Sequence, residues 1–129
     1  MHQHRPRRRH GFTLIELLVV LAVIATLLTI AVPHYFNSLE NSRETALRQS
    51  LAVVREAIDH HQGDLGRYPD SLEDLVERRY LRSVPTDPMT GRADSWVLVA
   101  PSEPDTGQLR DIRSGAPGNG RDGTAYESW

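Results

Sequence analysis

Gly11–Glu16 is the stretch that decides the architecture of this chain, and it reads Gly-Phe-Thr-Leu-Ile-Glu. An arginine-rich segment ends at its glycine, and an apolar run begins that extends from Phe12 to Val32. One charged residue, Glu16, and three threonines interrupt this run. As a helix the run would be about 31 Å long, which matches the hydrocarbon thickness of a bilayer. The sequence therefore predicts one membrane-spanning helix near the N-terminus.

The carboxylate of Glu16 is the unusual feature of this predicted helix. A charged side chain within a membrane segment costs about 2.5–3.5 kcal/mol on insertion scales. We therefore expect a positive group at the same depth, either on this chain or on a neighbour. Thr13-x-x-Glu16 also fits a capping box that opens a helix. Capping requires no partner, but it does not account for Gly11 and Phe12.

Charge places the two ends of the predicted helix on different sides of a membrane. The segment before Gly11 holds four arginines, Arg5 and Arg7–Arg9, and no acidic residue. By the positive-inside rule this segment stays in the cytoplasm, and the chain after Val32 lies outside. Without these four, eleven of the fifteen basic residues remain against seventeen acidic ones, a net charge of −6. An acidic exterior argues against a nucleic-acid partner.

The sequence offers little that is typical of an enzyme. The chain contains no cysteine, which removes thiol catalysis, cysteine zinc sites and disulfides from consideration. His60 and His61 follow Glu56 by about one turn, but we interpret them as solvated residues at a helix end rather than as metal ligands. Serines and acids do not form a recognisable nucleophile–base motif. We predict that the protein is not an enzyme.

The helix is expected to continue beyond the membrane as an amphipathic half. Pro33 would kink the helix rather than end it. Apolar residues then follow at helical spacing, and charged residues occupy the other face. The predicted apolar stripe comprises Phe36, Leu39, Leu47, Leu51, Val54, Ala57 and Ile58, and the predicted polar face comprises Glu40, Glu44, Arg48, Arg55, Glu56 and Asp59. We expect the helix to end near Gln62, before Gly63 and Gly66.

The rest of the chain predicts a small head with few strands. A capping box at residues 70–73 should open a short helix that ends near Arg79. Residues 96–99 are expected to form a strand that pairs with residues 108–113 in a hairpin. A glycine-rich segment follows, up to Trp129. The predicted fold class is α+β: a long N-terminal helix, half membrane and half amphipathic, packed on a head with a short helix and an antiparallel β-hairpin.

The opening hexapeptide, its basic leader and the apolar helix together resemble the type IV pilins and the type II secretion pseudopilins. This resemblance implies that a membrane peptidase cuts between Gly11 and Phe12 and that the new amine of Phe12 is methylated. It also implies that Glu16 pairs with the amine of an adjacent subunit during assembly. The chain would then consist of a leader at 1–11 that is removed, a membrane and assembly helix at 12–33, and a periplasmic head at 34–129.

Further along, the chain resembles the major pseudopilins of type II secretion. The similarity rests on Gly66–Pro69, Tyr80-Leu81, Pro85–Pro88 and the segment from Asp111 to Trp129. It implies a single-pass protein of the bacterial inner membrane whose head lies in the periplasm. It further implies a homopolymeric filament that drives protein export across the outer membrane. The implied partners are minor pseudopilins, an inner-membrane assembly platform with its ATPase, and the prepilin peptidase.

Two other functions remain open at this point. Within the family, the chain could be a type IV pilin or minor pilin that serves adhesion, motility or DNA uptake. From a different class, it could be a monomeric, signal-anchored binding domain in the periplasm. Cleavage at Gly11 separates a filament subunit from an anchored monomer, and gene neighbourhood separates the two kinds of filament.

The C-terminal loop departs from the family pattern. In major pseudopilins this loop commonly holds calcium through acidic side chains that follow a Gly-Thr step. Here the step is Gly123-Thr124, but Ala125 and Tyr126 follow it. The nearby side-chain oxygens belong to Asn119, Asp122 and Glu127. Calcium takes about six to eight oxygens, so either these three form a weak site with backbone and water, or Trp129 and local hydrogen bonds hold the loop. The departure favours the second interpretation.

Overall fold

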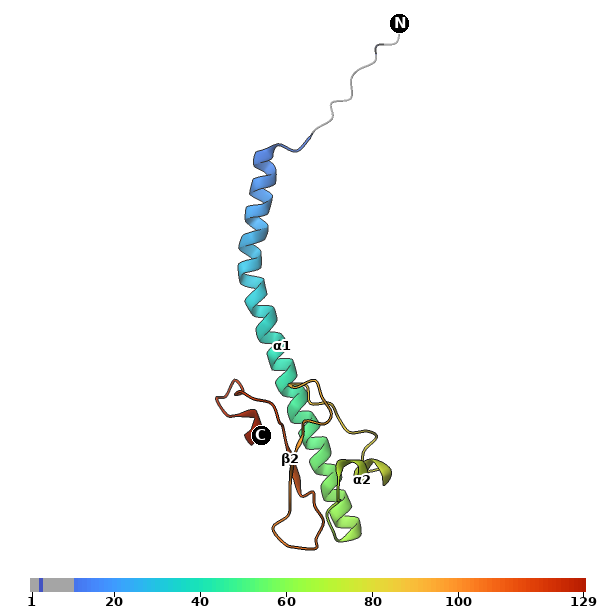
Figure 1. Ribbon diagram of the computed structural model, residues 1–129. Coiled ribbons are helices and arrows are strands. Elements are labelled where there is room, and N and C mark those ends of the chain that lie inside the picture. Colours follow the sequence, from blue (N-terminus) through green and yellow to red (C-terminus); the bar gives the residue numbers. More distant parts are fainter. Residues whose placement is uncertain (1–2, 4–10) are drawn as a thin grey trace. The chain divides into compact units, whose positions relative to one another are not determined.

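The computed structural model describes residue 3 and residues 11–129. The predicted leader 1–11 lies outside these residues except at Gln3 and Gly11. One helix, α1, runs from Leu14 to Leu65, and it is the element of the described chain that is long and apolar enough to cross a membrane. The chain forms two compact units: an N-terminal unit that ends at Ser38, and a head that comprises Leu39–Trp129 (Figure 1).

α1 is longer than the sequence predicted, and the glycine that ends it is a different one. Gly63 lies within the helix, and α1 ends at Leu65 rather than near Gln62. The next residue, Gly66, has a positive φ of 70° and donates its N–H to the carbonyl of Gln62 at 2.8 Å. A glycine in this left-handed conformation is a common helix terminator because it has no Cβ to oppose the backbone.

The core of the head forms along one stripe of α1. Leu47, Leu51, Val54 and Ile58 are almost completely buried, as their spacing predicted. They contact the apolar residues of the later elements: Leu72, Leu75, Leu81, Trp96, Leu109, Ile112, Ala116 and Tyr126. Phe36, which the predicted stripe included, is 60% exposed and lies in the N-terminal unit. The apolar stripe of α1 is therefore buried in the core of the head only from Leu47 onward.

The short helix α2 spans Leu72–Glu77. Its N-cap is Ser71, whose hydroxyl accepts a hydrogen bond from the N–H of Asp74 at 3.1 Å. The Asp74 carboxylate in turn accepts the N–H of Asp70 at 3.4 Å. The N-cap is thus Ser71 rather than the expected Asp70, and the returning bond comes from Asp74 rather than Glu73 and goes to the residue before the N-cap.

Two strands, β1 (Val97–Val99) and β2 (Asp111–Arg113), pair antiparallel with Leu98 opposite Ile112. A buried hydrogen-bond network anchors the residue that follows β2 to the loop between α2 and β1. The Ser114 hydroxyl donates to the fully buried carboxylate of Asp87 at 2.6 Å, and the Met89 N–H donates to its other oxygen at 2.8 Å. The described chain thus has the long helix, short helix and small antiparallel sheet of a pilin-like α+β arrangement.

A chain that starts at Asn37 should be a soluble, folded monomer. It retains Leu39–Trp129, which holds the whole buried core, and it loses the exposed apolar segment. Circular dichroism should show substantial helix, and light scattering should give the mass of one chain. An aggregated or disordered product would mean that the head depends on residues 12–36.

Candidate processing and assembly site

The start of α1 presents Gly11, Phe12 and Glu16 without intramolecular contacts that would explain them. Phe12 is 92% exposed. Gly11 does not have a positive φ, and a Cβ added to it would meet no atom within 4 Å. The described structure therefore gives no steric reason for glycine at this position. Recognition by another protein, such as a peptidase, would explain a glycine at this position.

Thr13 caps the helix, but the cap does not use the carboxylate of Glu16. The Thr13 hydroxyl accepts the N–H of Glu16 at 3.3 Å, and the Thr13 carbonyl accepts the N–H of Leu17 at 3.2 Å. Within residues 11–129 the Glu16 side chain makes neither a hydrogen bond nor an ion pair. Capping thus accounts for Thr13 and leaves Glu16 unexplained. The helix dipole favours an acid in the first turn, but by less than the cost of placing the charge in lipid.

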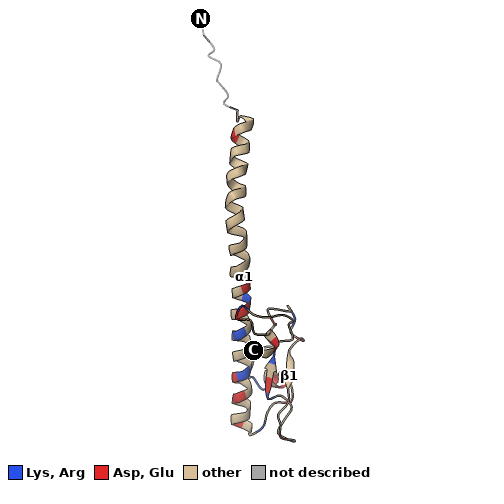
Figure 2. Cartoon of the chain, turned by 90° about the vertical axis from the view of Figure 1, so that its left-hand side faces the viewer, with Lys and Arg blue, Asp and Glu red and all other residues tan. Residues whose placement is uncertain are grey.

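The other polar groups of the apolar segment are satisfied within the helix itself. The Thr26 hydroxyl donates to the carbonyl of Ala22 at 2.8 Å, and the Thr29 hydroxyl donates to the carbonyl of Thr26 at 2.6 Å. Such bonds back to the preceding turn allow threonine to lie in an apolar environment. Glu16 is the only charged residue between Gly11 and Leu39, and the same half of α1 is otherwise uncharged in Figure 2. Its carboxylate therefore needs a partner that residues 11–129 of a single chain do not supply.

The second candidate site is the tail loop, Gly118–Trp129, which includes the short 3₁₀ helix η1 (Tyr126–Ser128). Asp122 closes a tight turn, because one of its oxygens accepts both the hydroxyl and the N–H of Thr124, at 2.6 and 3.0 Å. These hydrogen bonds, with the charge of Arg48, hold the pKa of Asp122 below its usual range. Asn119 and Glu127 are exposed. Within the described residues, no three acidic or histidine side chains lie close enough together to hold a metal ion.

Glu44 links this loop to α1, which corrects its assignment to the polar face. The side chain is buried, and one carboxylate oxygen accepts the N–H of Arg121 at 3.0 Å and the hydroxyl of Tyr126 at 3.2 Å. Burial and this hydrogen bond to Glu44 raise the pKa of Tyr126. Helical spacing places Glu44 beside the stripe, but only the folded tail shows that it lies inward.

His61 is also buried, contrary to the prediction of a solvated helix end. Its Nδ1 donates to the carbonyl of Arg67 at 2.8 Å, and its Nε2 lies 3.6 Å from a carboxylate oxygen of Asp74. The histidine thus joins the end of α1 to the following turn, while its buried Nε2 has no hydrogen-bond partner among the described residues. His60 remains exposed, 3.8 Å from Glu56.

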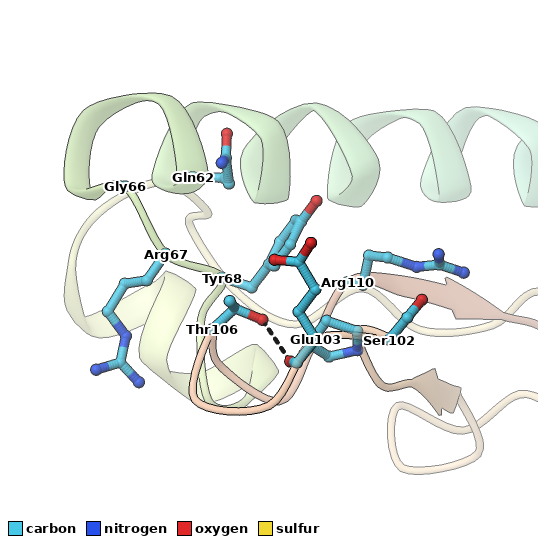
Figure 3. A pocket seen from close by; sticks show the side chains of 9 residues that line it. Gln62, Gly66, Arg67, Tyr68, Ser102, Glu103, Thr106 and Arg110 are labelled. Atoms are coloured by element: carbon cyan, nitrogen blue, oxygen red, sulfur yellow. Dashed lines mark hydrogen bonds between the residues drawn. The ribbon is translucent and has the colours of Figure 1, made fainter.

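A polar pocket of about 370 Å³ lies between the end of α1 and the loop before β2 (Figure 3). Arg67 and Arg110 point to opposite sides of it, and the Thr106 hydroxyl donates to the carbonyl of Glu103 at 2.8 Å. The lining includes hydroxyl groups but neither histidine nor cysteine. It therefore offers no activated nucleophile of the usual kind.

Replacing Glu44 by alanine should destabilise the head by about 1–3 kcal/mol, because the buried Tyr126 hydroxyl and the Arg121 N–H would lose their acceptor. Thermal melting of the full chain in detergent measures this effect. Glu40→Ala is the matched control, since Glu40 is exposed on the same helix. Equal melting temperatures for the two variants would contradict the role assigned to Glu44.

Comparisons with known proteins agree with these features. The prokaryotic N-terminal methylation motif matches residues 6–32. Type II secretion system core protein G from Dickeya chrysanthemi is 24% identical over 98 residues, which cover 76% of this chain and 64% of the relative. The protein of the same name from Pectobacterium carotovorum subsp. carotovorum is 26% identical over 97 residues, 75% of this chain and 62% of the relative.

The protein of that name from Vibrio cholerae is 26% identical over 137 aligned positions, covering 94% of this chain and 90% of the relative. The chain thus spans somewhat under two thirds of the first two relatives and most of the third. No solved structure matches this chain. The methylation motif and these relatives together confirm the resemblance of this chain to the type IV pilin and pseudopilin family.

Proposed function

We propose that this protein is a structural, non-enzymatic subunit of the periplasmic pseudopilus of a type II secretion system. The observation that carries this proposal is the carboxylate of Glu16, which has no partner among residues 11–129, in an apolar helix whose Thr26 and Thr29 are satisfied internally. Glu16 lies within residues 6–32, which match the methylation motif, and four residues after Phe12. A subunit that is cut after Gly11 and then assembled would need both the glycine at the cleavage position and the carboxylate of Glu16.

Cleavage between Gly11 and Phe12 would create the missing partner. The new amine of Phe12, methylated but still basic, carries a positive charge at the start of the helix. A neighbouring subunit shifted by about four residues, or about 6 Å along the helix axis, would bring its amine level with Glu16. The pair would neutralise both charges in a low-dielectric surrounding and set the register between subunits.

In this account the leader 1–11 stays in the cytoplasm until the prepilin peptidase removes it. Residues 12–33 anchor the subunit in the inner membrane, and residues 34–129 lie in the periplasm. An assembly platform and its ATPase would extract subunits from the membrane and add them to a homopolymer that minor pseudopilins complete. Contacts between apolar helices replace lipid contacts, and the growing filament helps to drive proteins across the outer membrane.

Deleting the gene in its native bacterium tests the proposal. We expect the proteins exported by type II secretion to accumulate in the periplasm, and the intact gene to restore their release. Normal export combined with lost motility, adhesion or DNA uptake would identify a type IV pilin instead. Normal export with an uncut, monomeric protein would identify an anchored periplasmic domain.

A further inference from the structure

The tail loop carries a feature that neither the proposed assembly nor the family pattern explains. Arg48 of α1 reaches the loop, and its guanidinium lies 3.4 Å from the Asp122 oxygen that does not contact Thr124. The same guanidinium lies over the ring of Trp129, 4.0 Å from the ring centroid. A cation in this position attracts both the carboxylate and the aromatic face.

The donor set of the loop does not fit the calcium ion that the family resemblance implies. Both oxygens of Asp122 are engaged, one by Thr124 and the other by Arg48. An ion bound to Asp122 would meet the positive charge of Arg48 at close range. The positions after the Gly-Thr step hold Ala125 and Tyr126, and the Tyr126 hydroxyl is directed to Glu44. The residues present therefore provide too few free carboxylate oxygens for calcium.

Trp129 completes the contact between Arg48 and the loop. Its indole N–H donates to the Thr124 hydroxyl at 2.7 Å, so it shares a partner with Asp122. Its ring lies so close to Gly120 that a Cβ there would approach Cζ2 to 2.2 Å. The ring of Trp129 thus packs between the backbone of Gly120 and the guanidinium of Arg48. Glu44, one turn before Arg48, holds the other side of the loop through Arg121 and Tyr126.

We propose that the guanidinium of Arg48 acts as a built-in cation for the tail loop, in place of a calcium ion. It neutralises Asp122, holds the face of Trp129 and fastens the loop to α1. The order of the loop is then independent of divalent cations. This inference concerns the folded head alone and holds whether or not the chain forms filaments.

Trypsin cleavage after Arg121 measures opening of the loop, because Arg121 is an exposed loop residue whose N–H is held by Glu44. The full chain in detergent is digested briefly, and the fragments are quantified by mass spectrometry. Cleavage after Arg92, an exposed residue in a different loop, is the internal reference for general unfolding. The ratio of the two rates reports the tail loop specifically.

Calcium or a chelator should leave this ratio unchanged in the wild-type chain. Arg48→Gln should raise it roughly fivefold, which corresponds to loss of one cation–π contact and one exposed ion pair. Arg48→Lys should give a ratio between those of the wild type and Arg48→Gln, since lysine retains the charge but not the planar guanidinium. Arg43→Gln, an exposed arginine of the same helix, should match the wild type.

Two results would overturn the proposal. One is protection of Arg121 by millimolar calcium or its exposure by chelator, which would reveal a bound divalent cation. The other is an unchanged ratio in Arg48→Gln. Should Arg48→Gln aggregate, Asp122→Asn tests the same pair, because it keeps an acceptor for Thr124 and removes the charge that faces Arg48. An unchanged ratio there would equally refute the role of Arg48.

Discussion

Glu16→Ala should abolish filament formation while leaving membrane insertion intact. The substitution makes the segment more apolar, so insertion becomes more favourable by about 2.5–3.5 kcal/mol. Two opposite charges about 4 Å apart attract each other by about 4 kcal/mol at an effective dielectric constant near 20. Losing an interaction of this size at every subunit contact should remove filaments from electron micrographs and reduce export accordingly.

Glu16→Gln and Glu40→Ala are the matched variants for this experiment. Glutamine keeps the shape and hydrogen-bonding capacity of Glu16 but not its charge, so it should fail like alanine. Glu40→Ala removes an exposed acid from the same helix and should assemble normally. Filaments of normal number and length from Glu16→Gln would show that charge pairing does not drive assembly.

The mature protein should begin at Phe12 and carry one N-methyl group. Intact-mass measurement of membrane-extracted protein should show the loss of residues 1–11 and the gain of one methyl. Replacing Gly11 by leucine should leave the full-length precursor in the membrane, since the fold itself tolerates a side chain there. Without a free amine at Phe12, the precursor should not assemble.

Gly63→Ala is the control for the Gly11 substitution. A Cβ at either glycine would meet no atom within 4 Å, so both positions have room for a side chain to start. Gly63→Ala should be processed like the wild type. An uncut wild-type chain in cells with an active prepilin peptidase would contradict the predicted junction, as would normal cutting of Gly11→Leu.

The elements that follow from local pattern were predictable from the sequence. Leu47, Leu51, Val54 and Ile58 repeat at helical spacing, so their burial against the head follows from periodicity alone. The strands 97–99 and 111–113 lie within the segments predicted from a β-prone run and from its partner across a turn-forming loop. The long apolar helix was predictable from its length and composition alone.

The errors arose where distant residues decide the environment. Glu44 is buried because Tyr126, far along the chain, requires its carboxylate. His61 is buried because the chain turns back after Gly66 and the carbonyl of Arg67 accepts a hydrogen bond from its Nδ1–H. Neither contact has a periodic signal in the sequence. Likewise, the tail loop's lack of acidic residues was visible, but the approach of Arg48 to Trp129 was not.

Crosslinking between neighbouring helices is the most direct test of the central claim, that Glu16 of one subunit meets Phe12 of the next. The chain contains no cysteine, so introduced cysteines give no background. Leu14→Cys and Leu17→Cys, both exposed on α1, would be placed on two separately tagged copies and oxidised in the membrane. We expect a ladder of mixed crosslinks that disappears when both copies also carry Glu16→Ala. The same ladder with and without Glu16, or monomers alone in the presence of the assembly platform, would contradict it.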